Sequence, residues 1–217
     1  MTPKPRDRIL DAAMAVFRRH GFRRSSIEQA AEAAGLTRQA LYHHFRSREA
    51  LFRAVIERVH ENALAAGSAG AATADKAGGG LADILVSQIT ARLKQFIASF
   101  DGSPHVDELF SEHLLQARDL YQKYAALYAA QSVATIERVR RKQRLALGMT
   151  PHELSRCIEM AINGAKSLHP GMQPAGAFLG DLTVMARTLI AGAVTTKPAA
   201  KKIIPKKSTP KKPGGRL

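Results

Sequence analysis

The chain has 217 residues, of which 33 are Lys or Arg and 18 are Asp or Glu, so its formal net charge is +15. This charge excludes an acidic solvating protein and favours a polyanionic partner, either nucleic acid or an anionic membrane surface. An apolar content of 45% is ordinary for a globular protein. The single cysteine, Cys157, excludes an intramolecular disulfide framework and a cysteine-based zinc site.

The positive charge is concentrated at the two ends of the chain. Residues 1–60 carry +6 and residues 197–217 carry +8, whereas residues 61–196 carry only +1. This asymmetry predicts separate roles along the chain. No apolar run reaches the roughly 18 residues that cross a bilayer. The stretch 9–17 is amphipathic, which is not the pattern of a signal peptide.

Apolar residues recur at spacings of three and four along most of the chain, which predicts an all-α protein of about nine helices. The first helix is expected from about Arg6 to His20, and Gly21 is a suitable C-terminal cap for it. Ser26 begins a second helix with Gln29 three positions later, which is a capping-box pattern.

Residues typical of turns interrupt the helical pattern at four places: 66–80, 101–104, 148–151 and 169–174. The first of these is almost entirely Ala, Gly, Ser and Thr, so we expect a flexible connector or a frayed helix end there. We therefore predict an N-terminal domain over residues 1–65, a helical domain over residues 81–195, and a Lys/Pro-rich tail over residues 197–217.

The segment from Ile27 to Phe45 has the spacing of a helix-turn-helix motif. Such a motif needs a small residue where the helices cross, here Ala31, and a glycine in the turn, here Gly35. Leu36 fills the turn, and Leu41 is expected to point back into the core. The alternative is an ordinary helical hairpin, which also favours glycine in a tight turn.

The second helix of this motif presents long side chains that donate hydrogen bonds. A helix fits the major groove of DNA, where Arg and Gln make paired contacts with guanine and adenine edges. We expect base contacts from Arg38, Gln39, Tyr42 and His43. We expect phosphate contacts from residues at or near helix starts and beside the second helix: Ser26, Thr37, His44 and Arg48. The alternatives are buried or solvated histidines, and an Arg48 that pairs with Glu49 or Glu28.

The chain resembles the DNA-binding domain of the TetR family of bacterial transcriptional repressors from Arg8 to Phe52. This segment is RILDAAMAVFRRHGFRRSSIEQAAEAAGLTRQALYHHFRSREALF. The match includes an apolar first helix that ends in Gly-Phe, the AxxAGL and LYHHF segments, and Arg48 at the start of a Glu-Ala-Leu helix. Ser26 stands where the family often has Thr, and Ala30 stands where the family prefers a larger aliphatic residue.

The resemblance implies an all-helical C-terminal domain that binds a ligand and forms dimers through its last two helices. Two narrow apolar seams suit such an interface. The first seam contains Leu154, Ile158, Ala161, Ala165 and Leu168, and the second contains Phe178, Leu182, Met185 and Leu189. All of these except Leu168 are the expected interface residues. Dimerisation would also place two helix-turn-helix motifs on two half-sites of DNA. The alternative is that both seams face the core of their own subunit.

A pocket for a small-molecule effector is expected among the helices of residues 81–147, with the start of the helix after Pro151. Its candidate lining residues are Phe96, Phe100, Phe110, His113, Tyr121, Tyr124, Met160 and Asn163. Each of them has ordinary core packing as its alternative. The identity of the effector does not follow from the sequence, and we expect neither a cofactor nor a metal.

We therefore expect a dimeric, sequence-specific repressor that binds a double-stranded DNA operator and is released by a small molecule. Its expected location is the cytoplasm, at the nucleoid, without membrane contact. The first alternative is a low-specificity architectural DNA-binding protein, in which a disordered basic tail contacts phosphates. An enzyme is not expected, because Cys157 and His152 lack any accompanying oxyanion pattern and the eight histidines form no metal-ligand cluster.

Overall fold

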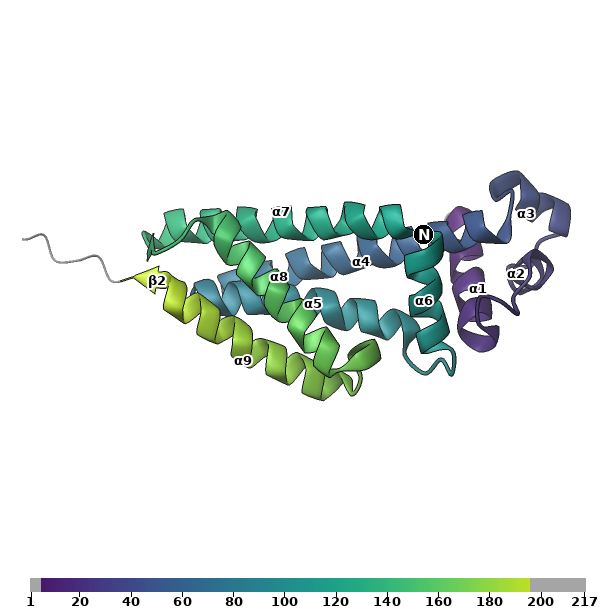
Figure 1. Cartoon of the computed structure of the whole chain (residues 1–217). Coiled ribbons are helices and arrows are strands. Elements are labelled where there is room, and N and C mark those ends of the chain that lie inside the picture. Colours follow the sequence, from purple (N-terminus) through teal and green to yellow (C-terminus); the bar gives the residue numbers. More distant parts are fainter. Residues whose placement is uncertain (1–4, 196–217) are drawn as a thin grey trace, which may run out of the picture.

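A computed structural model describes residues 5–195 of the chain (Figure 1). These residues form nine α-helices, a short 3₁₀ helix and one two-stranded antiparallel ladder, which confirms the prediction of an all-α fold with about nine helices. None of the described helices is long and apolar enough to cross a membrane. The predicted tail over residues 197–217 lies outside the described residues.

Three short helices form one end of the molecule together with the start of a long fourth helix (Figure 1). They are α1 (Pro5–His20), α2 (Ile27–Ala33), α3 (Arg38–His44) and α4 (Arg48–Lys76). Aromatic packing stabilises their core, because the rings of Phe17 and Phe22 lie 5.2 and 4.7 Å from the ring of Phe52 on α4. The sequence periodicity of α1 arises from this burial, since Ile9 and Phe17 are both almost fully buried.

The helix α4 continues without a break through residues 66–76, so a flexible connector at 66–80 is wrong over most of this length, and the alternative of a helix end is closer to the structure. The small residues there allow α4 to approach α5 (Leu81–Phe100) closely. A Cβ added at Gly70 would lie only 2.7 Å from the Ala91 side chain and from the Ser87 carbonyl oxygen. The glycines and alanines thus mark a helix crossing. The chain turns at residues 77–80 instead.

The remaining helices form an elongated body behind this end of the molecule. They are α5, α6 (Val106–Gln116), α7 (Arg118–Gln143), α8 (Pro151–Leu168) and α9 (Ala175–Ala193), with the 3₁₀ helix η1 (Pro170–Met172) between the last two. Figure 1 shows α4, α5 and α7 running along the molecule while α6 crosses near the N-terminal helices. The strands β1 (Ala146–Leu147) and β2 (Val194–Thr195) pair at the far end.

The buried apolar side chains form two core clusters. One joins α1–α4 to the start of α7 and includes Phe100 and Leu109. The other lies among α5, α7, α8 and α9. Phe96 and Phe110 pack against both clusters, with their rings stacked 5.9 Å apart. The two cores therefore meet where α5 and α6 adjoin.

Candidate DNA-binding surface and effector cavity

The turn between α2 and α3 has the geometry that the helix-turn-helix spacing predicted. Ser26 and Thr37 cap the two helices, and their hydroxyl oxygens accept hydrogen bonds of 3.2 Å from the backbone N–H groups of Gln29 and Ala40. Gly35 adopts a left-handed conformation with φ of +65°, which a side chain would strain. Leu41 is fully buried, so α3 packs one face inward and leaves the other face outward.

The outward face of α3 carries the residues predicted to contact DNA bases. Arg38, Gln39, Tyr42 and His43 are all exposed, and so is His44. The Arg38 guanidinium lies 5.4 Å from the centre of the Tyr42 ring and forms a 2.7 Å ion pair with Glu28. An ion pair this exposed contributes little stability, so it leaves Arg38 available for a new partner.

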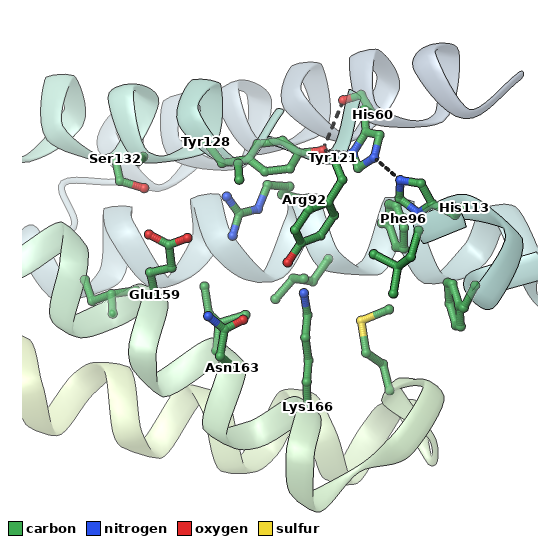
Figure 2. Close-up of a pocket in the computed structure, with 18 of the residues that line it drawn as sticks. His60, Arg92, Phe96, His113, Tyr121, Tyr128, Ser132, Glu159, Asn163 and Lys166 are labelled. Atoms are coloured by element: carbon green, nitrogen blue, oxygen red, sulfur yellow. Dashed lines mark hydrogen bonds between the residues drawn. The ribbon is translucent and has the colours of Figure 1, made fainter. Parts of the chain in front are cut away.

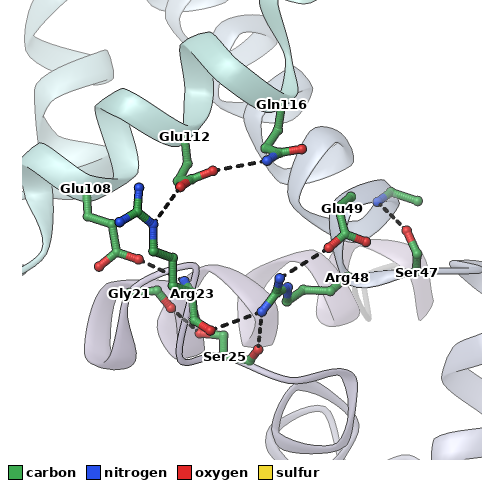
Figure 3. A network of polar contacts seen from close by, with 10 residues as sticks. Gly21, Arg23, Ser25, Ser47, Arg48, Glu49, Glu108, Glu112 and Gln116 are labelled. Carbon is green, nitrogen blue, oxygen red and sulfur yellow. Dashed lines mark hydrogen bonds and ion pairs between the residues drawn. The ribbon is translucent and has the colours of Figure 1, made fainter.

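Arg48 forms contacts within the protein, and the phosphate contact expected of it stays a prediction. Its guanidinium donates hydrogen bonds of 3.1 and 3.2 Å to the carbonyl oxygens of Arg23 and Ser25, and it also pairs with Glu49 (Figure 3). The same group lies 4.4 Å from the centre of the Phe22 ring. Arg48 therefore fixes the segment between α1 and α2 to α4, and the pairing with Glu49 is one that the sequence had left open.

A cavity of about 290 Å³ lies among α4, α5, α6, α7 and α8, with η1 at one end (Figure 2). Of the predicted pocket residues, Phe96, Phe110, His113, Tyr121 and Asn163 line it. Three others do not. Tyr124 and Phe100 are buried in the core, and Met160 is 58% exposed on the outer side of α8. The periodicity of aromatic residues identified the right helices but did not separate cavity from core.

Most of the polar side chains of the cavity were not predicted from the sequence. His60 on α4, Arg92 on α5, Tyr128 on α7, and Glu159 and Lys166 on α8 all line it. Arg92 interrupts the apolar face of α5 in the sequence, and that is the one signal that pointed to it. His60 escaped notice because the expected pocket began at residue 81.

Two neutral histidines form a polar chain in the wall of the cavity. His60 Nδ1 lies 2.8 Å from the Tyr128 hydroxyl oxygen, and His60 Nε2 lies 3.1 Å from His113 Nε2 (Figure 2). Burial is the main cause that lowers the pKa of His60 to about 3 and that of His113 to about 4, and the positive charge of Lys166 contributes to both shifts. Because one of two facing nitrogens donates while the other accepts, the neutral pair is satisfied without a counter-ion.

The helix α6 connects the cavity to the N-terminal helices. His113 lines the cavity, while its neighbour Glu112 is buried and accepts a 2.9 Å ion pair from Arg23 Nε (Figure 3). Glu108 accepts a 2.8 Å hydrogen bond from the Arg23 backbone N–H. A Cβ at Gly21, where φ is +76°, would overlap the Glu108 carboxylate, so this glycine permits the close approach of α6.

The structure places five of the eight residues of the predicted dimer interface in the core of the subunit. These five are at most 2% exposed: Leu154, Ile158, Ala165, Phe178 and Leu182. A side chain without exposed surface has none to bury against a partner, which corrects the interface expected from these residues. The remaining three, Ala161, Met185 and Leu189, are half-buried. The seams thus reflect packing within one subunit, the alternative that the sequence had left open.

Comparisons with known proteins agree with this fold and with the motif. Residues 9–55 match the family model described as "Bacterial regulatory proteins, tetR family". The HTH-type transcriptional regulator UidR of Escherichia coli K12 is 42% identical over 60 residues, which are 28% of this chain and 31% of UidR. The chain therefore aligns with about a third of the length of this curated relative.

Two solved structures share the fold over nearly the whole chain. One is SmeT, the repressor of the Stenotrophomonas maltophilia multidrug efflux pump SmeDEF, with a TM-score of 0.58 and 23% identity over 88% of this chain and 91% of SmeT. The other is Thermus thermophilus FadR, a TetR-family repressor in complex with lauroyl-CoA, with a TM-score of 0.59 and 18% identity over 90% of this chain and 98% of FadR. The N-terminal segment therefore matches the DNA-binding domain of the TetR family, and nearly the whole chain shares the fold of these two solved repressors.

Proposed function

We propose that this protein is a sequence-specific transcriptional repressor that binds its operator as a homodimer and leaves it when a small molecule fills the cavity. The observation that carries the proposal is the exposed face of α3, which presents Arg38, Gln39, Tyr42 and His43 beyond a properly capped helix-turn-helix. Regulators of this kind act at the chromosome, so we expect the protein in the cytoplasm.

Recognition of the operator follows from the shape and chemistry of α3. An α-helix fits the major groove, and the guanidinium of Arg38 and the amide of Gln39 match the edges of guanine and adenine. Ser26 and Thr37 already accept backbone hydrogen bonds through their hydroxyl oxygens. We expect these hydroxyl groups and the exposed His44 to contact phosphate oxygens, and such contacts fix the register of the protein on DNA.

The outward face of α8 and α9 is the surface that we propose for the second subunit. Leu168 is 73% exposed, Val184 is 66% exposed and Met160 is 58% exposed. A Cβ added at Gly164 or Gly180 would meet nothing within 4 Å, so both helices are open to close approach there. Exposed apolar side chains beside small residues suit a self-complementary contact between two helix pairs.

Release from DNA is proposed to pass through α6. A ligand that displaces His113 moves the same helix turn that holds Arg23 through Glu112 (Figure 3). Arg23 belongs to the segment that positions α2 and, through it, α3. A small rotation of α6 would therefore change the position of the recognition helix, and with it the separation of the two α3 helices in a dimer. The ligand then weakens DNA binding to the extent that it binds the rotated arrangement of α6 more tightly than the original one.

The proposed function is tested by comparing the affinity for the natural upstream DNA with the affinity for a scrambled duplex. Purified protein is titrated by fluorescence anisotropy against the DNA upstream of its own gene and against a scrambled duplex of equal composition, at about 0.15 M salt. Specific binding predicts at least about a thousandfold preference for the natural sequence. In a Gln39→Ala variant that preference should fall by about 1–3 kcal/mol. Equal affinity for both duplexes would refute the proposal.

A further inference from the structure

Arg92 on α5 is a buried cation that faces the cavity without an anionic partner. The residue is 7% exposed, and within residues 5–195 its guanidinium has no hydrogen bond or ion pair; burial lowers its pKa, and the charge of Glu159 opposes this only from a distance. The guanidinium does form a cation–π contact with Tyr128, whose ring centre lies 4.3 Å from the guanidinium carbon. An unpaired buried charge is costly to a fold. Arg92 is therefore best explained by a partner that enters the cavity from outside.

A second cation lies across the cavity from Arg92. Lys166 is half-buried and extends from α8 into the same space (Figure 2). Glu159 is the one carboxylate of the lining and projects from α8 into the cavity (Figure 2). It forms no ion pair with either cation, but its charge opposes the lowering of the pKa of Arg92 and of Lys166 by burial. The histidines of the wall are neutral, as described above. The cavity therefore carries a net positive charge between Arg92 and Lys166.

The rest of the wall is apolar and largely aromatic. Phe96 and Phe110 stack with their centres 5.9 Å apart, and Leu93 and Ile162 extend this surface from α5 and α8. A cavity of about 290 Å³ holds a molecule larger than a simple inorganic anion. The combination calls for a ligand with an acidic group at one end and an apolar body at the other.

We propose that the ligand of this cavity is an amphipathic organic anion whose acidic group lies between Arg92 and Lys166. Its apolar body lies against Phe96 and Phe110. The inference rests on the proposed function, in which the cavity holds the effector, but its chemistry is measurable without DNA. Glu159 repels the acidic group from the rim, so removing its charge strengthens binding.

A matched pair of fluorescent probes tests the requirement for negative charge. The anion 8-anilinonaphthalene-1-sulfonate and the neutral N-phenyl-1-naphthylamine share one carbon skeleton and differ by the sulfonate. The variants are Arg92→Met and Lys166→Met, which keep much of the side-chain volume. Each substitution should lower the affinity for the anionic probe about tenfold or more, because a charge-assisted contact is lost. The affinity for the neutral probe should stay nearly unchanged. Glu159→Gln should raise the affinity for the anionic probe.

Arg156→Met is the control, since it removes an exposed cation that lies outside the cavity on α8, the helix of Lys166. It should change neither affinity. The thermal midpoint of Arg92→Met should equal that of the wild type or be higher, because the substitution removes a buried cation without a partner. If the arginine were purely structural, its loss would lower the midpoint. If Arg92→Met does not fold, Lys166→Met and Glu159→Gln decide the question alone.

Equal affinity of the wild type for both probes, or an anionic probe insensitive to these charges, would overturn the inference. That result would leave operator binding, and so the proposed function, intact. Loss of operator preference with the expected probe affinities would instead refute the proposed function and preserve the anion site.

Discussion

Individual residues in the cavity wall make the stability of the fold depend on pH. His60 and His113 are each 4% exposed, and burial lowers their pKa values to about 3 and about 4. An unfolded histidine binds its proton near pH 6.5. Between these values the unfolded chain holds more protons than the folded chain, so stability is lost as the pH falls from about 6.5 towards 4.

The first prediction is that lowering the pH from 7 to 5 reduces the free energy of unfolding by about 1–2 kcal/mol for each of the two histidines. Urea unfolding at the two pH values measures this change. A His113→Gln variant should lose roughly one histidine's share of it. His152→Gln, at the exposed start of α8, serves as the control and should retain the full pH dependence. An unchanged slope in His113→Gln would contradict this account of the cavity wall.

At the scale of elements, the crossing of α4 and α5 depends on small residues. An added Cβ at Gly70 would lie 2.7 Å from both the Ala91 side chain and the Ser87 carbonyl oxygen, and the latter is backbone that cannot move aside cheaply. The second prediction is that Gly70→Ala lowers the free energy of unfolding by about 1–3 kcal/mol. Chemical denaturation is the measurement.

Gly192→Ala is the matched control for this substitution, because nothing lies within 4 Å of a Cβ added near the end of α9. Alanine is the better helix former, so this variant should be as stable as the wild type or more stable. If both substitutions had the same effect, the close approach of α4 and α5 would not be the reason for the glycine.

The helix α6 is the element that links the two candidate sites. The third prediction is that Arg23→Gln reduces the factor by which a cavity ligand weakens operator binding, while the affinity of the ligand itself changes little. The reason is that the 2.9 Å pair with Glu112 on α6 is lost. The measurement is operator affinity with and without saturating ligand.

Arg24→Gln removes the same charge from the adjacent exposed position and controls for the general weakening of DNA binding. It should keep the full coupling factor. Equal coupling in wild type and Arg23→Gln would place the connection elsewhere, for example along α4, which runs from the recognition motif to His60.

Local patterns predicted the elements well where each residue had a local reason. Ser26, Thr37 and Gly35 act through backbone geometry within a few positions, so the helix-turn-helix was predictable down to its caps. The segment 66–76 was not, because its glycines are explained only by α5 lying against them. Arg92 and Lys166 are 74 positions apart in the sequence, and only the fold brings them to one cavity.

The apolar seams of α8 and α9 illustrate the same limit. Periodicity identifies a buried face but not what buries it. Leu154 and Phe178 are covered by their own subunit, whereas Leu168, at the end of the first seam, and Val184, outside both seams, remain exposed. Burial against a partner and burial in the core produce the same spacing in the sequence.

At the scale of the whole molecule, the fourth prediction concerns assembly. Leu168→Glu combined with Val184→Glu should convert a dimer to a monomer, because carboxylates would be buried against each other at a self-complementary contact. Analytical ultracentrifugation measures the change. Leu115→Glu, at a 70% exposed apolar position on α6, is the control and should remain dimeric. A double variant that sediments like the wild type would exclude this face as the interface.

The positive charge of the chain is also a property of the whole molecule. Residues 1–60 carry +6 and residues 197–217 carry +8, so both parts are expected to attract DNA phosphates. Charge alone strengthens binding to any sequence and makes it dependent on salt. In the proposed function, the side chains of α3 distinguish one base pair from another. Removing the C-terminal charge should therefore lower the affinity for DNA without changing the preference for one sequence over another.

The most direct test of the account is the preference for natural over scrambled DNA, measured at several salt concentrations for the full chain and for a protein that ends at residue 195. If α3 recognises the operator, the shortened protein binds both duplexes more weakly and with a smaller salt dependence, but keeps its preference for the natural sequence. A shortened protein that binds both duplexes equally would contradict recognition by α3 and would favour an architectural protein driven by the basic tail.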